Sequence, residues 1–78
     1  MTTRTDWRTF SARQRLALAA LREAGPKGHT AVELSLRIVS TVDSAARIAT
    51  SLVCAGYARR QTLLGRTIYV ADVDEAPA

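Results

Sequence analysis

The sequence predicts a small, mainly α-helical domain that ends in a β-hairpin. The helices are predicted by two capping-box patterns, each followed by apolar residues at helical spacing. The hairpin is predicted by two strand-like runs, 57–61 and 66–70, which flank a short segment containing Gly65. With 78 residues, of which 47% are hydrophobic, the chain can build one domain with a thin aliphatic core.

The first helix is expected to begin after Ser11, and residues 1–9 precede it as an arm. Ser11 and Gln14 have the spacing of a capping box, in which each side chain binds the backbone N–H of the other residue. Leucines and alanines then recur along one face. Gly25 and Pro26 end the helix, because Gly tolerates the backbone angles found after a helix and Pro cannot continue one.

The second helix is shorter, and the third follows it closely. Thr30 and Glu33 form the second capping box, and an apolar stripe ends near Val39. After a short turn, the third helix is expected from Asp43 to Ala55. Its polar side is predicted to contain Asp43, Arg47, Thr50, Ser51 and Cys54, opposite an apolar side of Ala45, Ile48, Ala49 and Leu52.

The order of the elements is typical of one particular fold. Two helices joined by a short turn form a helix-turn-helix, and a hairpin directly after the second helix forms a wing. We therefore expect a winged helix-turn-helix domain, with three helices and a wing, over residues 10–71. Residues 72–78 are acidic and contain proline, so they are expected to form a flexible tail.

Three stretches of the chain resemble winged helix-turn-helix regulators of the MarR type. They are FSARQRLALAALREAG, HTAVELSLRI and TVDSAARIATSLVCAGYARR. In the last stretch, Leu52, Gly56, Tyr57 and Arg60 match the family's pattern, in which glycine ends the recognition helix and the next residue anchors the wing. The resemblance covers residues 10–71 and implies a minimal DNA-binding domain that places the third helix in the major groove.

The charge of the chain agrees with a nucleic-acid partner. The chain has 11 basic and 7 acidic residues, and three of the acidic ones lie in the last seven positions. Residues 1–71 therefore carry 11 basic and 4 acidic groups, a net charge of +7, which suits a polyanion.

We expect a small sequence-specific protein that binds double-stranded DNA and regulates transcription in the cytoplasm, associated with the nucleoid. The third helix should face the major groove, with Thr41 on the DNA backbone. Wing arginines should bind flanking phosphates or the minor groove. The predicted DNA-binding residues are Thr41, Ser44, Arg47, Thr50, Ser51, Arg59, Arg60 and Arg66. A homodimer on paired half-sites is consistent with the small number of base-reading side chains.

The alternative is a protein-binding domain of the same fold, such as an adaptor or inhibitor encoded by a phage or another mobile element. Leu63 and Leu64 are apolar at the expected wing tip, and Trp7 in the arm is a further candidate for protein contact. The third helix has only one long cation, Arg47, and the additional dimer-forming helices of full MarR-type chains are missing. Either both leucines bind a partner or one of them packs back on the third helix.

Other functional classes lack their sequence signals. The chain has one His, one Cys, no paired carboxylates on one face and no glycine-rich phosphate loop. We therefore expect neither an enzyme nor a bound metal or cofactor. The longest apolar run, 16–21, is much shorter than the ~20 residues needed to cross a bilayer, so no membrane partner is expected.

Overall fold

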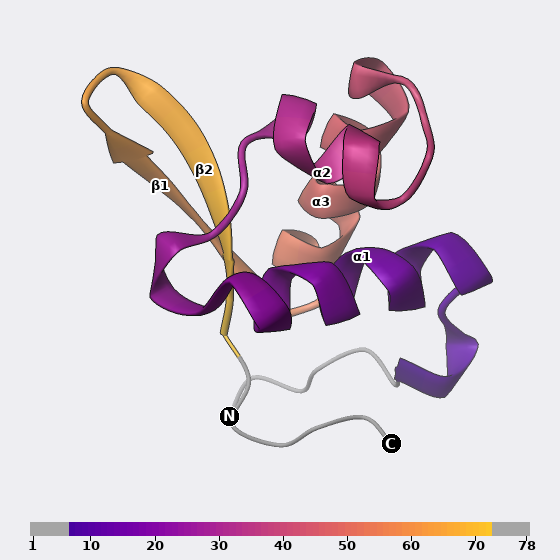
Figure 1. Ribbon diagram of the computed structural model, residues 1–78. Coiled ribbons are helices and arrows are strands. Elements are labelled where there is room, and N and C mark those ends of the chain that lie inside the picture. Colours follow the sequence, from indigo (N-terminus) through magenta and orange to yellow (C-terminus); the bar gives the residue numbers. More distant parts are fainter. Residues whose placement is uncertain (1–6, 73–78) are drawn as a thin grey trace.

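The computed structural model describes residues 7–72, which form three α-helices followed by a two-stranded antiparallel hairpin (Figure 1). The elements are α1 (Ala12–Ala24), α2 (Ala31–Arg37), α3 (Val42–Cys54), β1 (Ala58–Leu63) and β2 (Arg66–Ala71), with short 3-10 helices at Trp7–Thr9 and Gly25–Lys27. The predicted layout, mainly helical with a terminal hairpin, is confirmed. Most of the predicted arm and tail, and the side chain of Trp7, lie outside the described part of the chain.

Both predicted capping boxes are present. At the start of α1, the Gln14 N–H donates to Ser11 Oγ (3.2 Å), and the Ser11 N–H donates to Gln14 Oε1 (2.8 Å). At α2, Thr30 and Glu33 exchange the equivalent bonds, of 3.2 and 2.9 Å. These bonds satisfy N–H groups that the first turn of a helix leaves without partners, so each helix start is determined locally.

The connection between α2 and α3 differs from the prediction. α2 ends at Arg37, and Val39 does not belong to its buried stripe. Val39 has a φ of 53° and is 84% exposed, because the chain reverses here and the Ser40 N–H donates to the Ser35 carbonyl oxygen. Thr41 then caps α3, which begins and ends one residue earlier than predicted.

The three helices pack around four fully buried leucines, Leu18, Leu21, Leu34 and Leu52. Phe10 and Tyr57 extend this core, with ring centroids 5.2 Å apart in an edge-to-face arrangement. Tyr57 directly precedes β1, so its burial anchors the start of the hairpin on the helices. Ile48, predicted to lie on the apolar side of the third helix, is only half-buried.

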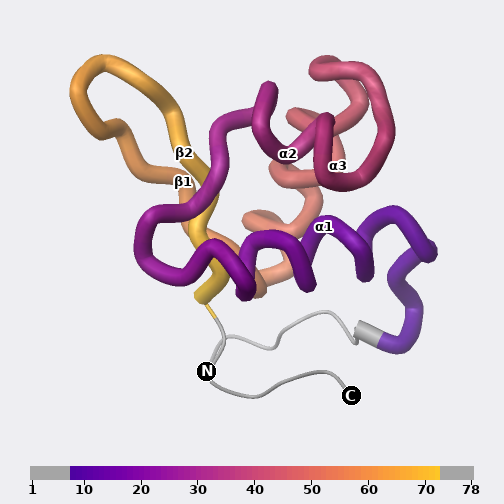
Figure 2. Tube along the Cα trace, viewed as in Figure 1, coloured from indigo at the N-terminus to yellow at the C-terminus, as the bar shows by residue number. Residues whose placement is uncertain are grey.

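β2 lies between β1 and the segment that precedes α2. β1 and β2 are joined by a two-residue turn, Leu64–Gly65. On the other edge of β2, the His29 N–H donates to the Tyr69 carbonyl oxygen (3.0 Å), and the Tyr69 N–H donates to the His29 carbonyl oxygen (2.8 Å). The base of the hairpin is therefore held on both sides, whereas its tip projects beyond the helices (Figure 1 and Figure 2).

Candidate functional site

The outward side of α3 carries four side chains at helical spacing, here called the α3 ridge: Asp43, Arg47, Thr50 and Cys54. Three of them are exposed and Thr50 is half-buried. The buried side of the helix consists of Ala45, Ala49 and Leu52. The predicted outward orientation of these four residues is confirmed, and α3 presents a polar surface along its length.

Arg60 of β1 lies against one side of the α3 ridge. Its Nη2 donates to Thr50 Oγ1 over 3.1 Å. Its guanidinium carbon also lies 5.8 Å from the centroid of the Tyr69 ring, within the range of a cation–π interaction. The structure therefore brings together two residues predicted from distant segments, Thr50 and Arg60, and fixes the orientation of a cation beside α3.

Ser51 lies on the other side of the helix and faces α1. Gln14 Nε2 donates to Ser51 Oγ (3.1 Å), and the Ser51 hydroxyl donates to the Ile48 carbonyl oxygen (2.6 Å). Ser51 was predicted to face the same way as Arg47, but its hydroxyl is used in a contact between two helices. Helical periodicity could not indicate this, because it does not show which neighbouring helix covers the edge of the polar side.

The long cation of the α3 ridge is paired within its own helix. Arg47 Nη2 lies 3.3 Å from Asp43 Oδ2, and the two side chains are 82% and 80% exposed. Exposed pairs with this i, i+4 spacing contribute only about 0.3–0.5 kcal/mol in helices. Arg47 is therefore held weakly, and a stronger anionic or hydrogen-bonding partner can replace Asp43.

The three hairpin arginines do not share one surface. Side chains alternate between the faces of a strand, so Arg59 points to the face opposite Arg60. Arg66 is paired with Leu63, which shares its face with Arg59, so Arg66 also lies opposite Arg60. Arg59 Nε is 3.5 Å from Asp72 Oδ1 at the base of the hairpin. Only Arg60 therefore adjoins the α3 ridge.

Arg66 lies close to an anionic side chain of α2. Arg66 and Glu33 line the same hollow at the hairpin tip. Hydrogen bonds from the Thr30 backbone N–H and hydroxyl lower the pKa of Glu33 below its ordinary value of 4.5, with smaller contributions from the charges of His29 and Arg66. The surface around Arg66 thus combines both signs of charge.

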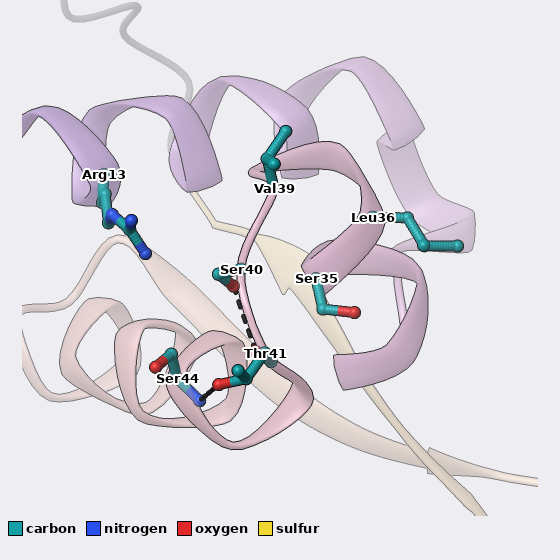
Figure 3. Close-up of a pocket in the computed structure, with 7 residues that line it drawn as sticks. All are labelled: Arg13, Ser35, Leu36, Val39, Ser40, Thr41 and Ser44. Atoms are coloured by element: carbon teal, nitrogen blue, oxygen red, sulfur yellow. Dashed lines mark hydrogen bonds between the residues drawn. The ribbon is translucent and has the colours of Figure 1, made fainter.

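A second hollow, of about 550 Å³, lies where the start of α1 meets the α2–α3 connection (Figure 3). Its lining residues are Arg13, Ser35, Leu36, Val39, Ser40, Thr41 and Ser44. Two of the predicted site residues meet here, and Thr41 Oγ1 accepts a hydrogen bond from the Ser44 N–H (3.1 Å). Arg13 was not predicted. Its sequence signal is an arginine in a first helical turn that has no acidic residue.

The hairpin tip carries two exposed leucines, Leu63 and Leu64. Leu63 is 58% exposed and Leu64 is 94% exposed, so neither packs back on α3. Leu64 has a φ of 52° and Gly65 has a φ of 76°, the combination typical of a type I′ turn. Such turns favour Asn, Asp or Gly at both positions, so the turn geometry does not account for a leucine at position 64.

Comparison of the chain with models of known protein families, with curated proteins and with solved structures gave no match. Among residues 7–72, no His, Cys, Asp and Glu side chains form a group of three that could hold a metal ion. None of the helices in this range is long and apolar enough to cross a membrane.

Proposed function

We propose that this chain is a winged helix-turn-helix domain of the MarR type that binds double-stranded DNA and regulates transcription. In this proposal, α2 and α3 form the helix-turn-helix and the hairpin is the wing. The observation that supports it best is the position of Arg60. A hairpin cation lies against Thr50, so helix and hairpin present one continuous polar surface to a partner. The excess of basic over acidic residues favours a polyanion as that partner.

The α3 ridge enters the major groove, whose width of about 12 Å admits a helix. Arg47 occupies the middle of the ridge, and it exchanges its weak pair with Asp43 for a bidentate contact with guanine O6 and N7. Asp43 is then able to accept from a cytosine amino group. Thr41 and Ser44, at the start of α3, face the DNA backbone.

The wing arginines act on phosphates. Arg60 is held in place by Thr50 and Tyr69, so it can bind a phosphate through its remaining N–H groups with little further ordering. Arg59 and Arg66 reach flanking phosphates or the minor groove from the other face of the hairpin. A homodimer associated with the nucleoid would place two copies of the ridge in successive half-sites.

Two substitutions test this division of roles. Arg60→Ala should weaken binding to every duplex and reduce the slope of log K against log salt by about 1, the effect of one lost phosphate contact. Arg47→Ala should cost about 1–3 kcal/mol on a site selected from random duplexes and little on other sequences. Fluorescence anisotropy over a salt series measures both effects. Lys27→Ala is the control, since it removes one charge just after the far end of α1.

Two results would count against the proposal in different ways. If the wild-type protein shows no salt-sensitive affinity for any duplex at low ionic strength, DNA binding is refuted. If Arg47→Ala and Arg60→Ala weaken binding equally on all sequences, the surface is basic but has no base-reading residue, and the sequence-specific part is refuted.

The exposed hairpin tip favours a second candidate function, a protein-binding adaptor or inhibitor. Leu63 and Leu64 together present an apolar surface that the fold itself does not use. If this surface binds protein, L63S/L64S should abolish self-association or partner binding in light scattering while the melting temperature and DNA affinity stay unchanged. Unchanged association of the double variant would remove the main support for this candidate.

A further inference from the structure

We infer that Arg13, Thr41 and Ser44 form a binding site for one DNA backbone phosphate, on the side of the α3 ridge opposite Arg60. This inference rests on the proposed DNA-binding function and adds a contact from α1 that the sequence did not predict. The phosphate occupies the hollow between the start of α1 and the start of α3 (Figure 3).

The guanidinium of Arg13 is available to a ligand. Arg47, Arg59 and Arg60 each have a hydrogen-bond or ion-pair partner. The Arg13 guanidinium, in contrast, makes no hydrogen bond or ion pair with any residue in the described part of the chain. Figure 3 shows its side chain extending from α1 towards Ser44 at the start of α3. No acidic side chain lines this hollow.

The hydroxyl groups beside Arg13 are suitable donors to an anion. Thr41 Oγ1 accepts from the Ser44 N–H, which leaves the Thr41 hydroxyl proton available. The Ser44 hydroxyl has no hydrogen-bond partner among the described residues. Ser40 is not included, because its hydroxyl donates to the Thr41 carbonyl oxygen (3.0 Å). Arg13, Thr41 and Ser44, which carry a guanidinium and two hydroxyls, thus line the same hollow.

The position of Arg13 is fixed by its neighbour. Gln14 caps α1 through its Oε1, and its Nε2 donates to Ser51 Oγ of α3. The first turn of α1 is therefore held against α3, and Arg13 has a defined place beside the first turn of that helix. A contact made through a fixed scaffold loses less conformational entropy when the ligand binds.

Folding alone does not favour an arginine at this position. Arg13 is the second residue of α1, where the helix dipole is positive and repels a cation. No acidic residue in this turn compensates for it. A bound phosphate supplies the missing negative charge, so the unfavourable placement has a functional reason under this inference.

The site also has a consistent place on the duplex. Arg60 and Gln14 contact α3 on opposite sides of its outward face, through Thr50 and Ser51 respectively. Arg13 lies on the Gln14 side, with α1. A helix in the major groove has a phosphate backbone on each side. Arg60 therefore binds the phosphates of one strand and Arg13 those of the other, and the two contacts fix the angle of α3 in the groove.

The test compares Arg13→Gln with Arg22→Gln in duplex-binding measurements over a salt series. Arg22 is nine residues further along α1, roughly 13 Å away along the helix axis and on the opposite face. Arg13→Gln should reduce the slope of log K against log salt by about 1 on every sequence, while Arg22→Gln changes it little. The melting temperature of Arg13→Gln should equal or exceed that of the wild type, because an unfavourable charge is removed. Arg13→Lys should retain most of the slope.

The outcomes separate this inference from the proposed function. If the wild type binds duplex DNA but Arg13→Gln keeps the full slope, or if Arg22→Gln loses as much, the phosphate site is refuted and DNA binding stands. If the wild type binds no duplex, both are refuted. If inorganic phosphate alone shifts the NMR signals of Thr41 and Ser44 and competes with duplex at equal phosphate concentration, the site is a small-anion site, and its assignment to the DNA backbone is overturned.

Discussion

The base and the tip of the hairpin belong to one ladder of paired strands, but they have opposite environments. At the base, Ala58, Tyr69 and Val70 are buried, and β2 also pairs with His29. At the tip, every residue from Gln61 to Thr67 is exposed. The two-residue turn at the tip nevertheless requires positive φ angles, and one of its two residues is a leucine.

This difference shows which parts of the hairpin the fold determines. Base residues are restricted by packing, so substitutions there should change the stability of the domain. Tip residues are restricted only by the turn, and Leu64 does not follow the turn's own preference. Substitutions of the tip leucines should therefore leave the fold intact and affect the binding of a protein partner. Four predictions test or refine this comparison.

The largest effect is expected beneath the base, at Leu52. Its side chain is fully buried, and its carbonyl oxygen accepts from the Tyr57 N–H, where the hairpin begins. Leu52→Ala should reduce the free energy of unfolding by about 2–5 kcal/mol, measured by denaturant melts. Leu36→Ala is the control, because Leu36 is 77% exposed and its loss should change stability by no more than about 0.5 kcal/mol. Equal effects would mean that Leu52 is not a core residue.

A similar loss is expected for Gly28→Ala, at the segment that pairs with the base. Gly28 has a φ of 62°, and a Cβ there would overlap the Tyr69 carbonyl oxygen and lie 2.8 Å from Val70 Cγ2. Backbone strain and overpacking together should cost about 3 kcal/mol. At the tip, Gly65→Ala meets no atom within 4 Å, so only the strain at its φ of 76° applies, about 1 kcal/mol. A Gly65→Ala loss as large as that of Gly28→Ala would contradict the comparison.

At the tip itself, a substitution should increase stability. Leu64→Asn creates the Asn-Gly pair that type I′ turns favour, and it should stabilise the domain by about 0.5–1 kcal/mol. Leu63→Asn, one residue earlier on the strand, should give no such gain and serves as the control. Thermal melts measure both. If Leu64→Asn destabilises the domain, the leucine has a structural role that its 94% exposure does not reveal.

The smallest effect concerns the charge beneath the tip. The pKa of Glu33 is lowered on folding, so its ionised form stabilises the folded protein at pH values above the ordinary pKa of 4.5. This contribution is lost as the pH falls through the lowered pKa. Glu33→Gln should remove that pH dependence and keep an acceptor for the Thr30 N–H. Arg66→Gln should raise the pKa of Glu33 only slightly in an NMR titration. If Arg66→Gln raised the pKa of Glu33 as much as Thr30→Ala does, the charge of Arg66 at the tip would contribute as much to the start of α2 as its capping residue.

The features of the fold that depend on residues close together in the chain could be predicted from the sequence. Both capping boxes are contacts between residues three apart, so their partners can be read from the sequence directly. The outward side of α3 follows from helical periodicity in the same way. The end of α2 was misplaced, because the apolar Val39 suggested a continuing stripe while the reversal of the chain required a left-handed backbone there.

The candidate site, in contrast, depends on contacts between distant segments. The sequence predicted Thr50, Ser51 and Arg60 as DNA-binding residues. In the structure, Gln14 of α1 binds the Ser51 hydroxyl, whereas the Thr50 hydroxyl accepts from Arg60. It grouped three arginines as wing residues without assigning them to a face, whereas strand alternation and the Leu63–Arg66 pairing put Arg59 and Arg66 on the face opposite Arg60.

The sequence by itself therefore determined the number and order of the α-helices, the capped starts of α1 and α2, the presence of the hairpin and the outward face of α3. Each of these depends on side chains a few residues apart. Only the tertiary structure decided that β2 pairs with His29 and that Arg13 lies beside the start of α3. The physical reason is that helix packing and strand pairing join residues separated by about thirty or forty positions, and neither periodicity nor capping specifies which surfaces will meet.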